Sequence, residues 1–248
     1  MSIRQQVIQI LQKHSGNSNP IVPFDPGRDK LLLLDFTENN KELIANVFND
    51  TQRFTDYINQ KLKLAQARYG IGGYNEYREV YSRSRVFSSP SNPLSIPTAI
   101  GREEEPRRLH LGIDIWGKPY TAVMAPFDGI VHSFAFNNNY GDYGATLILT
   151  HNLDGCSFHS LYGHLSLNSI KNLREGGNVK KGDVIAEFGI PMENGQWPPH
   201  LHFQIINDMG EWKGDYPGVC KYSESEKYLE NSPDPDLVLQ MMKYTTKI

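Results

Sequence analysis

The spacing of apolar residues changes at about residue 100. Before that point apolar side chains recur every three or four positions, and after residue 108 they form short runs between glycine-marked turns. We therefore expect a mainly β fold with a helical N-terminal extension. We divide the chain into residues 1–100, a mostly helical extension and linker; residues 101–220, a β domain; and residues 221–248, a tail with a short helix.

The extension begins with a predicted helix. Ser2 and Gln5 have the spacing of a capping box, and Gly16 is a residue type that commonly ends a helix. A longer helix is predicted over residues 50–69, with Gly70 at its end. Each helix has an apolar stripe, which is more often a packing surface than a ligand site. The stripes consist of Ile3, Val7, Ile10 and Leu11 in the first helix and of Phe54, Ile58, Leu62 and Ala65 in the second.

The β domain is predicted from runs of apolar residues bounded by turn residues. These runs cover residues 109–115, 121–124, 129–136, 145–151, 158–164, 184–189 and 200–206. A shorter run, residues 31–34, is either a strand or a turn of helix, and periodicity alone does not decide between them. In the tail, Asp236 is predicted to begin the short helix.

Composition and charge exclude several classes of protein. The 248 residues carry a formal net charge of -3 without a basic stripe, so we expect no nucleic-acid partner. Cys156 and Cys220 occur in no paired motif, which argues against a disulfide framework. No apolar run is long enough to span a bilayer, and the N-terminus lacks the apolar core of a signal peptide. We expect a cytoplasmic location, or a periplasmic or extracellular one if a leader was removed.

A histidine and a carboxylate lie four positions apart in the first predicted strand of the β domain. His110, Gly112 and Asp114 share one face of that strand. A straight strand would separate His110 from Asp114 by roughly 13 Å, at about 3.3 Å per residue, which is too far for two bonds to one metal ion. The chain must therefore bend between them, and Gly112 is the residue where it can bend.

Two further segments carry histidines. His200 and His202 alternate within residues 199–203, so one can bind a metal while the other lies beside it. His164 lies between these segments, within residues 162–165. Each motif alone is more often a chance spacing or a packing residue. Because all three occur in one chain, we interpret them as one zinc-hydrolase site.

Six segments resemble the lysostaphin/LytM-type zinc metallopeptidases in order and spacing, over about residues 108–208. They are residues 110–114 (HLGID), 125–131 (APFDGIV), 144–151 (GATLILTH), 162–165 (YGHL), 177–183 (GNVKKGD) and 199–203 (PHLHF). The resemblance implies a LytM-like antiparallel β-sandwich or barrel-sandwich hybrid that holds one Zn²⁺ per chain. Residues 70–81, 197–199 and 215–219 are similar to a subgroup of standalone cytoplasmic proteins and domains fused ahead of aminotransferases. This similarity implies a functional link to an aminotransferase.

The resemblance also implies a role for each candidate residue. His110, Asp114 and His202 are implied as the zinc ligands, and His164 and His200 are implied to flank the catalytic water. The implied activity is that of a bacterial zinc metalloendopeptidase that cleaves amide bonds in peptidoglycan-type peptides. A peptide or muropeptide is therefore the expected substrate.

The chemistry of this residue set is suited to hydrolysis. Two neutral imidazoles and one carboxylate leave a net charge of +1 on a zinc site, with a fourth position open to water whose pKa the metal lowers towards roughly 7. The chain has no His-Glu-x-x-His motif that would supply a glutamate base. His164 and His200 are therefore the candidates for deprotonating the water and for stabilising the oxyanion, and the sequence does not apportion these two roles.

Two alternatives remain open from the sequence. The chain could be a non-enzymatic or regulatory LytM-like binding module, because the same fold is used by degenerate relatives that regulate partners. Residues 179–189 also resemble hairpins of lipoyl-type carrier domains. Residues 1–100 could gate the site, with Asn39, Asn75 or Glu76 reaching the open metal position, or could only pack on the sheet. Stoichiometric zinc would argue against the binding module.

Overall fold

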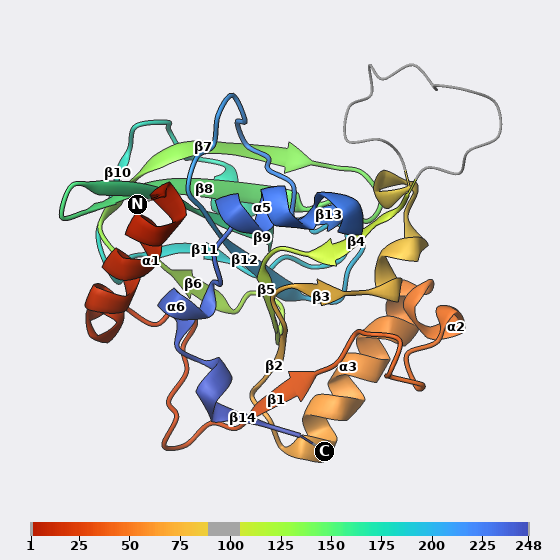
Figure 1. Ribbon diagram of the computed structural model, residues 1–248. Helices are drawn as coiled ribbons and strands as arrows, with labels where there is room; N and C mark the ends of the chain where they lie inside the picture. Colours follow the sequence, from red (N-terminus) through yellow and green to blue (C-terminus); the bar gives the residue numbers. More distant parts are fainter. Residues whose placement is uncertain (1, 89–104, 248) are drawn as a thin grey trace, which may run out of the picture.

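The computed structural model describes residues 2–88 and 105–247. It confirms the mainly β fold that we expected from the sequence (Figure 1). The described strands form one large mixed sheet and two small sheets. In spatial order the large sheet contains β10 (Asn178–Val179), β7 (Gly129–Asn137), β8 (Gly144–Leu153), β9 (Cys156–Leu165), β12 (His200–Ile206), β5 (Ile113–Trp116), β2 (Tyr69–Gly72), β1 (Leu31–Leu34) and β14 (Thr245–Thr246). The small sheets contain β11 (Val184–Glu187) with β6 (Ala122–Met124), and β13 (Val219–Lys221) with β4 (Arg107–His110) and β3 (Glu76–Tyr77).

The large sheet is antiparallel through its centre and parallel at one edge. From β7 to β2 each neighbouring pair is antiparallel, whereas β1 runs parallel to both β2 and β14. The N-terminal extension thus contributes β1 and β2, and β2 pairs directly with β5, with Gly72 opposite Asp114. The boundary that we propose near residue 100 therefore separates stretches of sequence that share one sheet.

Short helices accompany the sheets. The α-helices are α1 (Ile3–His14), α2 (Ala45–Phe48), α3 (Thr51–Ala65), α4 (Leu167–Ile170), α5 (Ser225–Asn231) and α6 (Asp236–Leu239). The 3₁₀ helices are η1 (Ser15–Asn17), η2 (Glu79–Arg83), η3 (Arg85–Phe87), η4 (Tyr222–Glu224) and η5 (Met242–Tyr244). In α1 both hydrogen bonds of the predicted capping box, between Ser2 and Gln5, are present. Among the described residues no helix is both long and apolar enough to cross a membrane.

The predicted end of the second long helix was wrong. Helix α3 ends at Ala65, and Gln66 adopts the left-handed conformation, with φ of 53°, that we expected of a glycine. Gly70 lies in β2 instead, where a Cβ atom would come within 2.4 Å of Leu34 Cδ1. Glycine at this position avoids a close contact with the Leu34 side chain. Residues 31–34, which the periodicity left undecided, form a strand that pairs with β2, with Leu32 opposite Gly70.

Helix α3 packs against the end of β5. Its predicted stripe is buried at Phe54 and Ile58, and the Phe54 ring lies 5.7 Å from the ring of Trp116 and 6.4 Å from that of Trp197. Trp116 ends β5, and Trp197 lies in the loop before β12. The apolar contacts of α3 thus connect the N-terminal extension to the two chain segments that flank the candidate site.

Candidate metal centre

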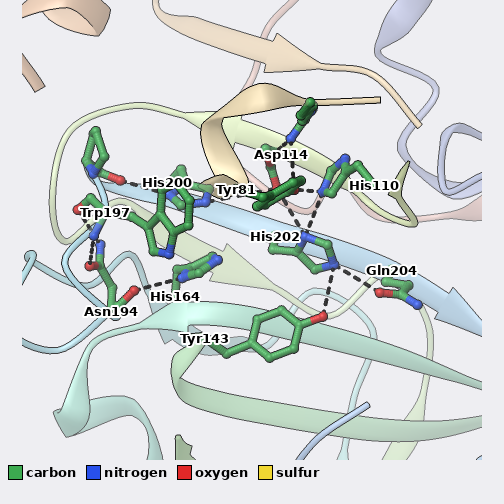
Figure 2. A network of polar contacts seen from close by, with 12 residues as sticks. Tyr81, His110, Asp114, Tyr143, His164, Asn194, Trp197, His200, His202 and Gln204 are labelled. Carbon is green, nitrogen blue, oxygen red and sulfur yellow. Dashed lines mark hydrogen bonds and ion pairs between the residues drawn. The ribbon is translucent and has the colours of Figure 1, made fainter. Parts of the chain in front are cut away.

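Strands β5 and β12 bring two of the candidate ligands together. These strands are antiparallel neighbours, and His202 lies directly opposite Asp114. His110 ends β4, which belongs to a different sheet, and the chain turns at Leu111 and Gly112 before it enters β5. One ligand atom each from His110, Asp114 and His202 lies within 4.8 Å of the other two (Figure 2). The bend that we expected at Gly112 is present.

The distances between the three donor atoms suit a single metal ion. His110 Nε2 lies 2.9 Å from His202 Nδ1, and Asp114 Oδ1 lies 3.2 Å and 3.1 Å from these two nitrogens. Tetrahedral ligands with bonds of about 2.0–2.1 Å are separated by about 3.3 Å, so the observed triangle has nearly the size that such a site requires. All three residues are at most 3% exposed.

The hydrogen bonds of the two imidazoles direct their lone pairs into this triangle. His110 Nδ1 donates to the Gly73 carbonyl at 3.0 Å, so Nε2 carries no proton in the neutral ring. His202 Nε2 donates to Gln204 Oε1 at 3.0 Å, which leaves Nδ1 without a proton. Burial lowers the pKa of His110 to about 4, so this ring is neutral at neutral pH. Two lone pairs and a carboxylate that converge within about 3 Å fit a bound cation.

Gly112 gives the His202 ring the space that it occupies. A Cβ atom on Gly112 would lie 2.5 Å from His202 Cε1, 2.6 Å from His202 Nε2 and 2.7 Å from the Phe203 carbonyl oxygen. Any side chain at this position would have to displace the imidazole or the strand that carries it. Gly112 therefore serves both the bend in the chain and the close approach of a candidate ligand.

His164 and His200 lie beside the triangle with their rings 4.1 Å apart. His164 Nδ1 donates to the Asn194 carbonyl and His200 Nδ1 to the Pro198 carbonyl, both at 2.8 Å. In the neutral rings Nε2 is then the acceptor, and His200 Nε2 lies 4.0 Å from Asp114 Oδ1. Burial lowers the pKa of His200 to about 4 and holds that of His164 well below its usual value. The structure thus brings all five predicted site residues together.

A cleft of about 880 Å³ leads to this cluster. Asp114, His164, His200 and His202 line it, so the carboxylate and three imidazoles can be reached from outside. Much of the remaining wall is aromatic. The aromatic residues of the wall are Tyr81, Phe87, Trp116, Tyr143, Trp197, Trp212 and Tyr216.

Four residues of the site were not among the predicted ones. Gln204 receives the His202 hydrogen bond, and the Tyr143 hydroxyl lies 3.4 Å from His202 Nε2. Arg78 binds Asp114, and the Tyr81 ring lies 6.2 Å from the His110 ring. Alternation could have identified Gln204, because it shares a strand face with His202.

The residues proposed to gate the site take other positions. The Glu76 carboxylate binds Arg78 at 2.5 Å, and Asn39 is exposed. Asn75 is exposed as well, and its backbone N–H donates to the His110 carbonyl at 3.0 Å, as part of the turn between β2 and β3. The region nevertheless reaches the site, because Arg78 and Tyr81 both line the cleft.

Comparison with known proteins identifies the central part of the chain. Residues 108–213 match the sequence profile of peptidase family M23. The chain carries a peptidase M23 domain. This finding confirms the resemblance to the lysostaphin/LytM family, whereas the link to aminotransferases stays a prediction. All three candidate ligands, His164 and His200 lie inside the M23 domain, and Arg78 and Tyr81 lie before it.

Two curated relatives align with about half of this chain. An uncharacterized metalloprotease of Haemophilus influenzae is 36% identical over 124 residues, which are 50% of this chain and 23% of the relative. The L-Ala–D-Glu endopeptidase of Bacillus subtilis is 29% identical over 128 residues, which are 48% of this chain and 37% of the relative. The chain thus spans well under half of the length of either relative. Among solved structures, the catalytic domain of lysostaphin from Staphylococcus simulans has a TM-score of 0.37 and 23% identity, over 71% of this chain and 98% of that one.

Proposed function

We propose that this protein is a zinc-dependent endopeptidase that hydrolyses amide bonds in peptides of the peptidoglycan type. The observation that carries the proposal is the triangle of His110, Asp114 and His202, whose donor atoms lie 2.9–3.2 Å apart inside an M23 domain and at a cleft. A buried set of donors with this spacing and these lone-pair directions fits a bound cation.

Zinc is the metal that suits these donors best. Two imidazoles and one carboxylate are a donor set of catalytic zinc sites, whereas Mg²⁺ and Ca²⁺ prefer oxygen ligands alone. His110, Asp114 and His202 would hold the ion. When bound, zinc supplies Lewis acidity that polarises the substrate carbonyl and makes water a stronger acid.

His164 and His200 provide the proton transfers. Each ring is neutral at neutral pH because burial lowers its pKa, and each has an unprotonated Nε2 that can accept the proton of an attacking water. The Nδ1–H bonds to the Asn194 and Pro198 carbonyls fix the orientation of the rings. After it has accepted the proton, the same Nε2 can donate it to the leaving nitrogen or to the oxyanion.

The cleft favours a peptide as the substrate. Its volume of about 880 Å³ is enough for several residues of an extended chain, and its aromatic wall would pack against their side chains. The family resemblance and the relative named L-Ala–D-Glu endopeptidase direct the choice towards peptidoglycan-type peptides. The alternative, a regulatory LytM-like module, needs no complete set of metal ligands and proton-transfer groups.

The test combines a metal assay with a peptide screen. The purified protein should contain about one zinc ion per chain, and it should release new amino and carboxyl termini from defined muropeptides in mass spectrometry. His202→Ala should lose both zinc and cleavage. His132→Ala removes an imidazole outside the cluster and serves as the matched control. Zinc-dependent cleavage that persists in His202→Ala would contradict the assignment, and a protein that binds a muropeptide without cleaving it would favour the regulatory module.

A further inference from the structure

Arg78 forms a buried ionic cluster with Asp114 and Glu76. Its side chain is 1% exposed, and Nη1 lies 2.5 Å from Asp114 Oδ2 while Nε lies 2.5 Å from Glu76 Oε2. Arg78 precedes the M23 domain, which begins at residue 108. A residue of the N-terminal extension thus binds one oxygen of a candidate ligand, and the other oxygen of the same carboxylate faces the two histidines.

We propose that Arg78 is a positioning residue of the metal centre, which holds Asp114 and, through the Gly73 carbonyl, His110 in the arrangement that binds the ion. This inference rests on the proposed function, since it assumes that the triangle binds zinc. The residue with this role belongs to the N-terminal extension and lies outside the M23 domain.

The first link is the direct one to Asp114. Arg78 Nη1 binds Oδ2 and thereby fixes the rotation of the carboxylate, so that Oδ1 is the oxygen left to face His110 and His202. Groups that hold metal ligands in place through hydrogen bonds commonly change metal affinity 10- to 100-fold when they are removed. The bond is charge-assisted, and both side chains are almost completely buried.

The second link passes through one backbone carbonyl. The Gly73 oxygen accepts from Arg78 Nη2 at 3.3 Å and from His110 Nδ1 at 3.0 Å. The same guanidinium therefore contacts one ligand and the group that sets the tautomer of another. Because the guanidinium is planar and has donors in fixed directions, it can serve Asp114, Glu76 and Gly73 at once, which a lysine ammonium at the end of a flexible stem cannot do equally well.

The fold holds Arg78 from several sides. The guanidinium lies 5.1 Å from the Phe36 ring centroid, and the Arg78 backbone amide donates to the Arg108 carbonyl at 2.9 Å. Gly72 leaves the necessary space, because a Cβ atom there would lie 2.6 Å from Arg78 Nη2. Glu76 offsets the positive charge of Arg78. The pair therefore adds little net charge beside the cation, and its main effect on the site is orientation.

The experiment removes the guanidinium without leaving Glu76 as an unpaired buried charge. The variants are the double substitution Glu76→Gln/Arg78→Met, the conservative Arg78→Lys, and Arg83→Met as the matched control. Arg83, the last residue of η2, is also a buried arginine, but it binds Tyr140, Thr51 and the Gln196 carbonyl rather than a candidate ligand. For each full-length protein we would measure the zinc affinity by chelator competition, the visible spectrum of the Co²⁺ form and the melting temperature without metal.

We expect the double variant to bind zinc about 10- to 100-fold more weakly than the wild type, with an altered Co²⁺ spectrum. The zinc affinity of Arg78→Lys should lie between that of the wild type and that of the double variant. If the double variant does not fold, the affinity and spectrum of Arg78→Lys decide whether Arg78 positions the ligands. Arg83→Met should lower the melting temperature and leave zinc affinity and spectrum unchanged. A folded double variant with wild-type affinity and spectrum would overturn the role of Arg78 while the metal site stands. A wild-type protein that binds no zinc would overturn the proposed function as well.

Discussion

At the scale of single residues, Gly112 is the position where the smallest change should have a large effect on the metal centre. In Gly112→Ala the new Cβ atom would lie 2.5 Å from the His202 ring and 2.7 Å from the Phe203 carbonyl oxygen, so the ring or the strand must move. We expect a loss of about 1–3 kcal/mol in the free energy of unfolding and weaker zinc binding. Thermal unfolding and zinc titration measure the two effects.

Gly16→Ala is the control for this variant, because no atom of the described residues lies within 4 Å of the position that its Cβ atom would take. Both the free energy of unfolding and the zinc affinity should stay close to the wild-type values. A Gly112→Ala protein that behaves like this control would show that the close approach of His202 is not required for metal binding.

His164 and His200 are expected to act on the proton rather than on the metal. Asn replaces His164 well, because its side-chain amide can still donate to the Asn194 carbonyl and because asparagine tolerates the left-handed backbone, with φ of 62°, at this position. We expect His164→Asn and His200→Asn to keep about one zinc per chain and to lower kcat by about 10²- to 10⁴-fold. Metal analysis beside peptide turnover tests this expectation, and loss of zinc in either variant would instead make that histidine a ligand.

The five candidate residues could be named from the sequence, whereas the residues that contact them from the N-terminal extension could not. Alternation along a strand and the need for a bend at Gly112 follow from local geometry, and the structure brings the predicted residues together. Arg78 and Tyr81 carry no comparable local signal. They reach the site only because β2 and β3 pair with β5 and β4, and pairing between distant strands is a property of the folded chain.

At the scale of secondary structure elements, glycines and short apolar runs did not distinguish helix from strand in the sequence. The glycine at position 70 is compatible with a helix end and with a strand, and its pairing with Leu32 of β1 places it in a strand. Residues 31–34 form a strand because they pair with β2 on one side and with β14 on the other. By contrast, the capping box at Ser2 was predictable, because both of its hydrogen bonds lie within a single turn.

His151 joins several elements and makes their packing depend on pH. Its Nδ1 lies 2.9 Å from the Asp128 carbonyl oxygen in the turn before β7, and its Nε2 lies 2.7 Å from Ser160 Oγ of β9. Burial lowers its pKa from 6.5 to about 4 in the folded protein. Between these values the unfolded chain binds a proton that the folded chain does not, so the free energy of unfolding decreases as the pH falls from about 6.5 to about 4.

The contribution of this one group is on the order of 3 kcal/mol at the lower end of that range. His151→Gln removes this titrating group. The slope of the unfolding free energy against pH should then decrease by an amount that corresponds to up to about one bound proton. Urea unfolding between pH 4 and 7, with a chelator present for both proteins, measures the slopes. Equal slopes for the variant and the wild type would show that His151 is protonated equally in the folded and unfolded states.

At the scale of the whole molecule, the candidate metal centre and the residues around it come from segments throughout the chain. Asp114 lies beside β2 of the extension, and His110 lies beside β3. His202 lies in β12, and the Gln204 amide that orients it donates to Ser232 of the tail at 3.0 Å. A cation bound at this junction connects two sheets and three regions of sequence. Its binding free energy therefore adds to the stability of the complete fold and not to that of one loop.

Removal of the metal should consequently lower the melting temperature of the entire protein in one transition. Zinc at about 1,000 times its dissociation constant stabilises a folded protein by about 4 kcal/mol, and each kcal/mol shifts the melting temperature by about 2–4 °C for a chain of this size. A chelator should thus lower the wild-type transition by roughly 8–16 °C. His202→Ala should melt at one temperature with or without the chelator. A wild-type transition that the chelator leaves unchanged would mean that the three donors converge without binding a metal ion, because any ion that binds only the folded state must raise its melting temperature.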